Sequence, residues 1–274
     1  DDLRFRSYNL RSNLDLNFTK NLSGTFDLSA NFNNQDQPGQ TYDMTIVALN
    51  SARPIVPAYW PDRSKPSAAG IKDGANPIYT SDRDWSGYRQ NKAQDFRASL
   101  SLNYDLSDLL IEGLGTSVKF DYTQRGAFGK NWLTGFDFYD YNPDDQTYTP
   151  VENYNHGKTT LTQSFNRRWD WRLEYRMNYS RVFSQVHRVS AVMLYEALSN
   201  RRDYFEAYRE GFISGSIDHL FAGSDQDKNN NGFATEGGRE SYVGRFNYGF
   251  SGKYLAEFTF RYDASADFIQ EKRW

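Results

Sequence analysis

The sequence predicts an all-β fold, an antiparallel transmembrane β-barrel segment of about eight strands with long loops at one end. The 274-residue chain is 17% aromatic, yet its mean hydropathy is −0.82 and no apolar run is long enough for a membrane-spanning helix. Apolar and polar residues alternate with a period of two in eight segments, which is typical of strands that have one apolar face. Short turns and long connections follow each other in strict order.

Composition narrows the class of protein before any motif is considered. The many aromatic residues argue against a disordered chain. The net charge of −3 provides no basic field for nucleic acid, and the absence of cysteine excludes disulfides and thiolate metal sites. The first ten residues, DDLRFRSYNL, contain no apolar signal-peptide core. A soluble all-β protein and an outer-membrane barrel remain.

Four hairpins are expected from the alternation. They cover residues 8–18 and 26–32, 96–104 and 118–122, 169–179 and 187–197, and 242–250 and 254–262. The apolar residues have even numbers in the first, second and fourth hairpins, but odd numbers in the third. In the return strand of the third hairpin, Val192 and Leu194 interrupt the pattern because they fall among the polar positions.

The connections between the hairpins are predicted to span residues 35–92, 128–162 and 198–238. All eight prolines lie in the first two, as expected for segments outside a sheet. Short periplasmic turns and long extracellular loops are typical of outer-membrane barrels, whereas compact soluble domains rarely contain structureless loops of this length.

The charged set of each strand is expected to face the lumen, because charge on a lipid-facing position costs about 2–4 kcal/mol at the midplane. A soluble sandwich with these charges in water is the alternative. The lumenal set consists of Arg97, Lys119, Arg172, Glu174, Arg245, Glu257 and Arg261. Both outermost strands would have their free ends on the extracellular side. Residues 1–274 are therefore expected to be part of a larger transmembrane barrel domain.

Two segments resemble a known family. The run Tyr242–Phe268, YVGRFNYGFSGKYLAEFTFRYDASADF, is similar to a hairpin of SusC/RagA-type TonB-dependent outer-membrane transporters, with the pattern R-x-N-Y, K/R-Y and R-x-D-G-S-S-x-F. Here Ala264-Ser265-Ala266 replaces the usual Gly-Ser-Ser, a difference in the turn that follows. The segment 8–15, YNLRSNLD, resembles the family's Y-N-x-R-x-N-L-D strand.

This resemblance implies a 22-stranded barrel in the bacterial outer membrane that imports large nutrients, either oligosaccharides or peptides. It implies a plug domain, energy from TonB through an N-terminal part, and a SusD-like lipoprotein on the extracellular face. The plug and TonB-binding part lie outside these residues. The alternative function is a structural or adhesive barrel without active transport. No histidine joins a hydrolytic set, so the protein is not expected to be an enzyme.

A calcium site is predicted in one loop from the spacing of oxygen ligands. Positions 1, 3, 5 and 12 of an EF-hand-like loop correspond to carboxylates and amides, although Asn230 stands where glycine belongs. A solvated loop tip is the alternative. The predicted ligands are Asp225, Asp227, Asn229, Asn231 and Glu236.

Aromatic residues in the loops are candidates for stacking on a nutrient, with loop packing or a membrane-interface girdle as alternatives. The favoured ligand contacts are Trp60, Trp85, Trp132 and Tyr139. The stretch Ser199–Gly211 is predicted to form a short helix that contacts the lipoprotein or packs on its own barrel.

Overall fold

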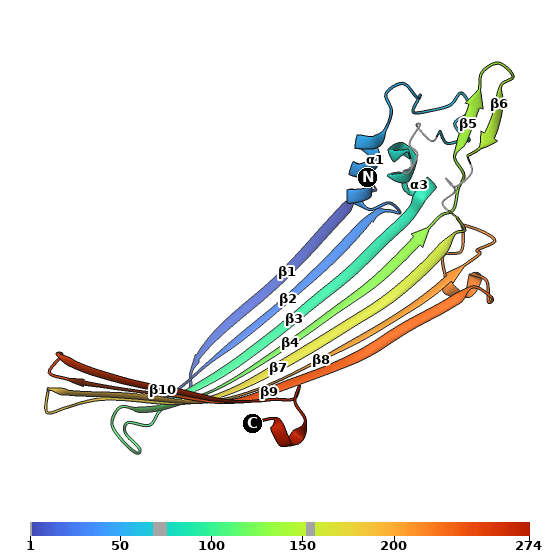
Figure 1. The fold of residues 1–274 in the computed structure, drawn as a ribbon. Helices are drawn as coiled ribbons and strands as arrows, with labels where there is room; N and C mark the ends of the chain where they lie inside the picture. Colours follow the sequence, from blue (N-terminus) through green and yellow to red (C-terminus); the bar gives the residue numbers. More distant parts are fainter. Residues whose placement is uncertain (1, 68–75, 152–156) are drawn as a thin grey trace.

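Eight long strands form a single antiparallel sheet in a computed structural model that describes residues 2–67, 76–151 and 157–274. The strands lie side by side in chain order (Figure 1). They are β1 (Arg4–Asn17), β2 (Leu22–Pro38), β3 (Gly87–Asp105), β4 (Leu114–Leu133), β7 (Thr160–Phe183), β8 (His187–Glu210), β9 (Lys228–Phe250) and β10 (Tyr254–Ser265). The prediction of an all-β antiparallel fold with eight strands is confirmed.

Shorter elements occupy the loops. They are α1 (Tyr42–Ser51), α2 (Pro77–Thr80), α3 (Arg83–Ser86), the hairpin of β5 (Tyr139–Asn142) and β6 (Thr147–Pro150), and the 3₁₀ turns η1 (Leu220–Ala222) and η2 (Gln270–Lys272). Among the residues with assigned positions, no helix has the length and apolar character needed to cross a membrane.

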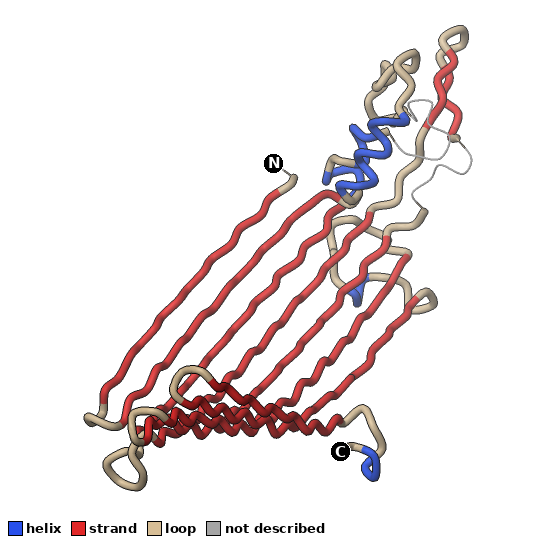
Figure 2. The backbone as a smooth tube through the Cα atoms, turned by 60° about the vertical axis from the view of Figure 1, so that its left-hand side comes forward, coloured by secondary structure: helices blue, strands red, loops and turns tan. Residues whose placement is uncertain are grey.

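Turns and loops separate to opposite ends of the sheet (Figure 2). Two of the tight turns are type I′: Ser184 and Gln185 have φ angles of 49° and 61°, and Ser251 and Gly252 have φ angles of 50° and 69°. This geometry matches the right-handed twist of the strands that it joins. We call the half of the sheet near the tight turns the turn half, and the half near the long loops the loop half.

In the turn half, the strand register places most apolar side chains of all eight strands on one face of the sheet and most polar side chains on the other. Leu14 pairs with Phe26, Phe120 pairs with Leu173, and Ala191 pairs with Phe246. Even positions of β1–β4, odd positions of β7 and β8, and even positions of β9 and β10 therefore share one side, which we call the apolar face. The predicted reversal of parity in the third hairpin is confirmed. The other side is the polar face.

One aromatic residue on the apolar face marks the loop-side end of the run of large apolar side chains in each strand, and only a small alanine, Ala197 or Ala264, follows it in β8 and β10. The aromatic residues are Tyr8, Phe32, Phe96, Tyr122, Trp169, Tyr195, Tyr242 and Tyr262, and we call them the aromatic row. Beyond the row, toward the loops, the same face is mainly polar. At the last strands, Trp274 stacks on Tyr242 and Tyr262 with ring centroids 5.7 and 5.2 Å apart.

The predicted loop boundaries are wrong, because the strands continue well beyond the aromatic row. The connections are residues 39–86, 134–159 and 211–227, each shorter than predicted. Likewise, the helix predicted for Ser199–Gly211 is wrong, because β8 continues to Glu210 with both neighbouring strands paired to it. Ladder hydrogen bonds on two sides outweigh the weak local helix signals. Gly211, with φ +70°, follows the strand directly.

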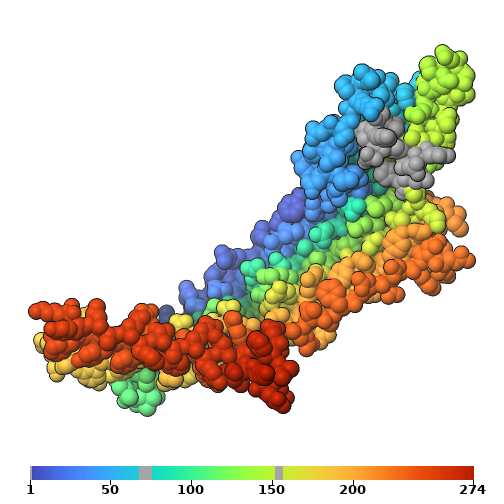
Figure 3. Space-filling view, viewed as in Figure 1, coloured from blue at the N-terminus to red at the C-terminus, as the bar shows by residue number. Residues whose placement is uncertain are grey.

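The loops pack into two small cores at the loop end. In one, Tyr79 and Phe138 are buried among the loops, which form the raised mass above the sheet in the space-filling view (Figure 3). In the other, Phe212 and Leu220 of the 211–227 loop pack against buried residues on the apolar face of the sheet. Those buried residues are Tyr88, Trp132 and Leu161.

Candidate functional site

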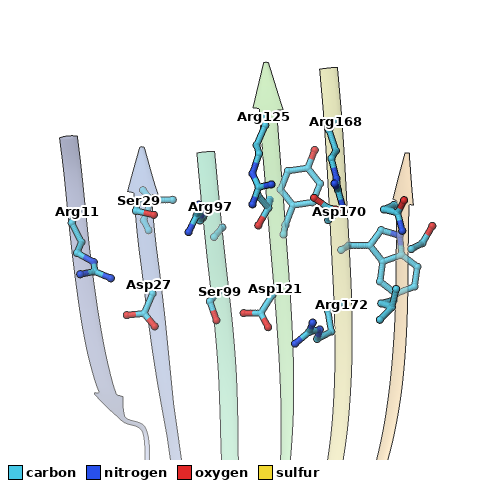
Figure 4. Close-up of a pocket in the computed structure, with 18 residues that line it drawn as sticks. Arg11, Asp27, Ser29, Arg97, Ser99, Asp121, Arg125, Arg168, Asp170 and Arg172 are labelled. Atoms are coloured by element: carbon cyan, nitrogen blue, oxygen red, sulfur yellow. The ribbon is translucent and has the colours of Figure 1, made fainter. Parts of the chain in front are cut away.

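A shallow depression of about 520 Å³ lies on the polar face, midway along the strands (Figure 4). Alternation in β1, β2, β3, β4 and β7 turns charged and hydroxyl side chains into it, and β8 adds Leu198 and Asn200. Five arginines and three aspartates line it, so its wall has a net positive charge. These residues are Arg11, Arg97, Arg125, Arg168, Arg172, Asp27, Asp121 and Asp170.

Most of the charges in the depression are already paired. Arg168 Nη2 lies 2.9 Å from Asp170 Oδ1, and Lys119 Nζ lies 3.1 Å from Asp121 Oδ2. Asp27 Oδ1 accepts a hydrogen bond from Asn13 Nδ2 at 2.5 Å. The two ion pairs occupy the carboxylates of Asp121 and Asp170, whereas Asp27 keeps its negative charge because Asn13 is neutral.

Two arginines of the wall are different because they have no ion pair with any described residue. Both arginines are exposed. Ser29 on β2 lies between them, because it pairs with Arg11 on β1 and with Arg97 on β3. A guanidinium has five donors in a planar fork that fits a carboxylate or phosphate. The pair, with the Ser29 hydroxyl between them, has the chemistry to bind an anionic group of a ligand.

Nearer the loop end, the polar face becomes aromatic and less charged. The rings of Tyr204 and Phe233 are 5.3 Å apart across β8 and β9, and the Arg202 guanidinium lies 5.4 Å from the Phe233 centroid. Tyr204 also donates a hydrogen bond to Glu206 at 2.6 Å. An organic ligand can stack on the exposed ring of Phe233 while its polar groups reach the neighbouring side chains.

Three of the four aromatic residues predicted to bind a nutrient make contacts between two loops. Trp60 Nε1 donates to the carbonyl of Tyr139 at 2.6 Å, and Trp85 meets Tyr79 and Phe136 edge-on at 5.2 and 5.6 Å. The Tyr139 ring lies under Lys65 Nζ at 4.4 Å. Three of the four residues therefore belong to one assembly, formed by the 39–86 and 134–159 connections.

Trp132 lies apart from that assembly and is only 4% exposed. Its ring meets Phe212 at 4.6 Å and helps to hold the 211–227 loop against the apolar face. Asp218 of the same loop lies 2.8 Å from Lys130 Nζ and accepts a short hydrogen bond from Tyr88. Partial burial raises the pKa of Asp218, but hydrogen bonds from Lys130 and Tyr88 outweigh it and hold the pKa below its ordinary value.

The residues predicted to bind calcium do not converge. The last three lie on β9, where Asn229 and Asn231 fall on the polar face and Glu236 falls on the apolar face. The two aspartates are paired with cations: Asp225 with Arg209 at 2.8 Å, and Asp227 with Lys158 at 3.6 Å. In the part of the chain that the structure describes, no three acidic or histidine side chains form a metal-sized group.

Sequence reasoning assigned Arg97 to the lumenal side but did not identify the depression. The available signal was parity combined with register: positions 11, 29 and 97 lie on the same face and in one row across three strands. Alternation gives the face from sequence, whereas the row depends on turn geometry.

Solved structures with a similar fold are known, whereas comparisons of the sequence alone find no match. No protein-family model matches the sequence, and no curated protein is significantly similar to it. Structures of the RagAB peptide importer are similar in its closed-closed state (TM-score 0.71, 17% identity) and its open-open state (0.70, 18%). A further structure of the RagAB peptide transporter has a TM-score of 0.67 at 18% identity.

Each of these matches covers 99% of the chain. The chain has the fold of a segment of that importer's β-barrel. It spans 28–29% of the length of the matched chains. The polar face of the sheet therefore corresponds to one side of a barrel wall, and its apolar face to the other.

Proposed function

We propose that this chain is part of a SusC/RagA-type TonB-dependent transporter that imports large nutrients across a bacterial outer membrane. The observation that carries the proposal is the similarity of fold to the RagAB importer along 99% of the chain. The resemblance of the Tyr242–Phe268 hairpin to this family supports it independently. In this proposal the apolar face meets lipid and the polar face lines the lumen.

Peptides are the ligand class that we propose first, with oligosaccharides as the alternative. The neighbouring structures are of a peptide importer, and the unpaired Arg11 and Arg97 suit the carboxylate of a peptide terminus or an acidic side chain. A neutral oligosaccharide would leave these two charges unused and would rely on stacking against rings such as Phe233.

Uptake by cells that carry the complete transporter tests this proposal. Cells with the gene should accumulate a labelled peptide, whereas deletion of the gene should abolish accumulation.

Arg97→Gln should weaken binding of a peptide with a free carboxyl terminus about tenfold, and binding of its C-terminal amide much less. The control is Arg261→Gln, on the same face but paired with Asp263 at 2.8 Å outside the depression. Equal accumulation of peptide and oligosaccharide with and without the gene would favour the structural or adhesive alternative.

A lipoprotein partner is part of the same proposal, and α1 offers a surface suited to it. This helix lies at the loop end (Figure 1). Its residues Met44, Val47 and Leu49 are each more than half exposed. Exposed apolar side chains grouped on one short helix are typical of a protein contact. Val47→Glu in the complete transporter should reduce co-purification of the lipoprotein. Asp43→Glu, on the same helix, should leave it unchanged.

A further inference from the structure

Three cations lie together on the apolar face, just beyond the aromatic row at β1–β3. Arg6 and Lys92 are in one register row, separated by Asn34, and Arg4 is two residues further along β1. Strand spacing puts the Cα atoms of Arg6 and Lys92 about 10 Å apart, and those of Arg4 and Arg6 about 7 Å apart. Side chains as long as these can reach one small group between them.

None of the three has an ion pair among the described residues, and all three are exposed. Asp36 is the one acidic residue in their rows, opposite Arg4, and it makes no ion pair with any of them. The other cations beyond the aromatic row on this face are neutralised. Arg167 lies 3.2 Å from Asp203, and Arg201 lies 2.7 Å from Glu236. The uncompensated positive charge is therefore confined to one sector.

The position of this sector relative to the aromatic row indicates what it meets. The three cations are two to four residues beyond Tyr8 and Phe96, about 7–13 Å along tilted strands. Aromatic side chains mark the membrane interface, and the polar headgroups of each leaflet extend several ångströms beyond the hydrocarbon. If the apolar face meets lipid, as in the proposed function, these cations lie at the level of the outer-leaflet headgroups.

We propose that Arg4, Arg6 and Lys92 form a binding site for the phosphate-bearing headgroup of an outer-leaflet lipid. The arginine forks donate in pairs to phosphate oxygens, and Lys92 adds a third positive charge. The acyl chains of the same lipid would lie along Leu10, Leu14 and Phe32 below. This inference rests on the membrane orientation of the proposed function, but it concerns a different face from the nutrient site.

Native mass spectrometry of the complete transporter in detergent tests the site directly. The protein is titrated with phosphatidylglycerol, with diacylglycerol of the same acyl chains, and with inorganic phosphate. Wild type should retain one tightly bound phosphatidylglycerol and bind diacylglycerol or inorganic phosphate far more weakly. The triple variant Arg4→Gln, Arg6→Gln, Lys92→Gln should bind phosphatidylglycerol at least about tenfold more weakly.

The matched control removes the same charge from the same face: Arg167→Gln, Arg201→Gln, Arg209→Gln, all cations that are paired in the structure. It should retain phosphatidylglycerol within about twofold, because it leaves the unpaired sector intact. Equal loss in both variants, or none in either, would overturn the site. So would equal binding of inorganic phosphate, which would indicate an anion site without lipid.

Peptide uptake separates this inference from the proposed function. The triple variant should import peptide at the wild-type rate, because its substitutions lie on the opposite face from the depression. Normal uptake combined with unchanged lipid binding in the triple variant would overturn the lipid site alone. A complete protein that does not fractionate with the outer membrane would overturn both.

Discussion

The two halves of the same strands obey different sequence rules. In the turn half, β3 alternates apolar and polar residues from Phe96 to Tyr104. In the loop half, the same strand carries Gln90, Lys92 and Gln94 on the apolar face, and the alternation disappears. The ladder of backbone hydrogen bonds is continuous through both halves. Hydrophobic periodicity therefore reports what a strand faces, and it says nothing about where the strand ends.

The halves are also stabilised differently on the apolar face. In the loop half, the 211–227 loop folds against β3, β4 and β7 and buries Trp132 to 4% exposure. In the turn half, large apolar residues of the same face, such as Leu100 at 44%, remain exposed. The loop supplies part of the apolar cover in one half, and in the proposed function lipid supplies it in the other.

The largest effect is expected from truncating the residue on which the loop packs. Trp132→Ala should destabilise the 211–227 loop by about 3–5 kcal/mol, because it removes a buried ring and leaves a cavity. Hydrogen exchange and limited proteolysis of the loop should both accelerate. Phe165→Ala, at a 42% exposed position of the same face, is the control and should change them little. If Trp132 instead binds nutrient, peptide affinity will fall while loop protection stays the same.

A charge placed on each half tests the comparison itself. Leu100→Arg, in the middle of the turn half, should cost about 2–4 kcal/mol of folding free energy in a bilayer. Gln94→Arg is on the same strand and face but beyond the aromatic row, so it should cost less than about 1 kcal/mol. Urea unfolding of the complete barrel in lipid vesicles measures both. Equal costs would contradict a lipid boundary at the aromatic row.

These contrasts explain which parts of the fold the sequence could predict. The pairing partners and faces were predictable, because Leu14, Phe120 and Phe246 sit in clear alternation. The outer reaches of the strands were not, because polar residues on both faces look like a loop. The same reason explains the placement of the predicted calcium ligands: Asn229, Asn231 and Glu236 resemble loop ligands in the sequence but belong to a paired strand.

The candidate site was predictable only in part. The side of the sheet on which Arg97 lies follows from parity, whereas its isolation from carboxylates depends on which rows the turns align. The contacts of Trp60 and Trp85 depend on tertiary packing between loops that are distant in sequence. Aromatic residues in loops could equally well be binding residues or a local core, and composition cannot distinguish the two.

Acidification should weaken the loop half selectively through Asp218. Its pKa is lowered in the folded protein, so its contribution is complete above its ordinary pKa, near 4, and is lost as the pH falls through the lowered value. Asp218→Asn should cost about 1–2 kcal/mol of loop stability at neutral pH. The expected cost is modest because a third of the Asp218 side chain is exposed and solvent screens its charge. Hydrogen exchange in the 211–227 loop at pH 3 and pH 6 should differ in wild type and much less in Asp218→Asn. A loop with the same pH dependence in both proteins would contradict this anchor.

The smallest effect is expected at the tight turns, where the two type I′ turns have serine at the first central position but different residues at the second. Gln185 and Gly252 occupy equivalent left-handed positions, with φ 61° and 69°. A side chain in this conformation is strained, and glycine is not, although glycine also gains entropy in the unfolded chain. Gln185→Gly should therefore stabilise the protein by about 0.5–1 kcal/mol, and Gly252→Gln should destabilise it by a similar amount. The midpoint of urea unfolding measures both.

Because neither turn contacts the loop half, hydrogen exchange in the 211–227 loop should remain unchanged in both variants. A change there would mean that the two halves are energetically coupled along the strands.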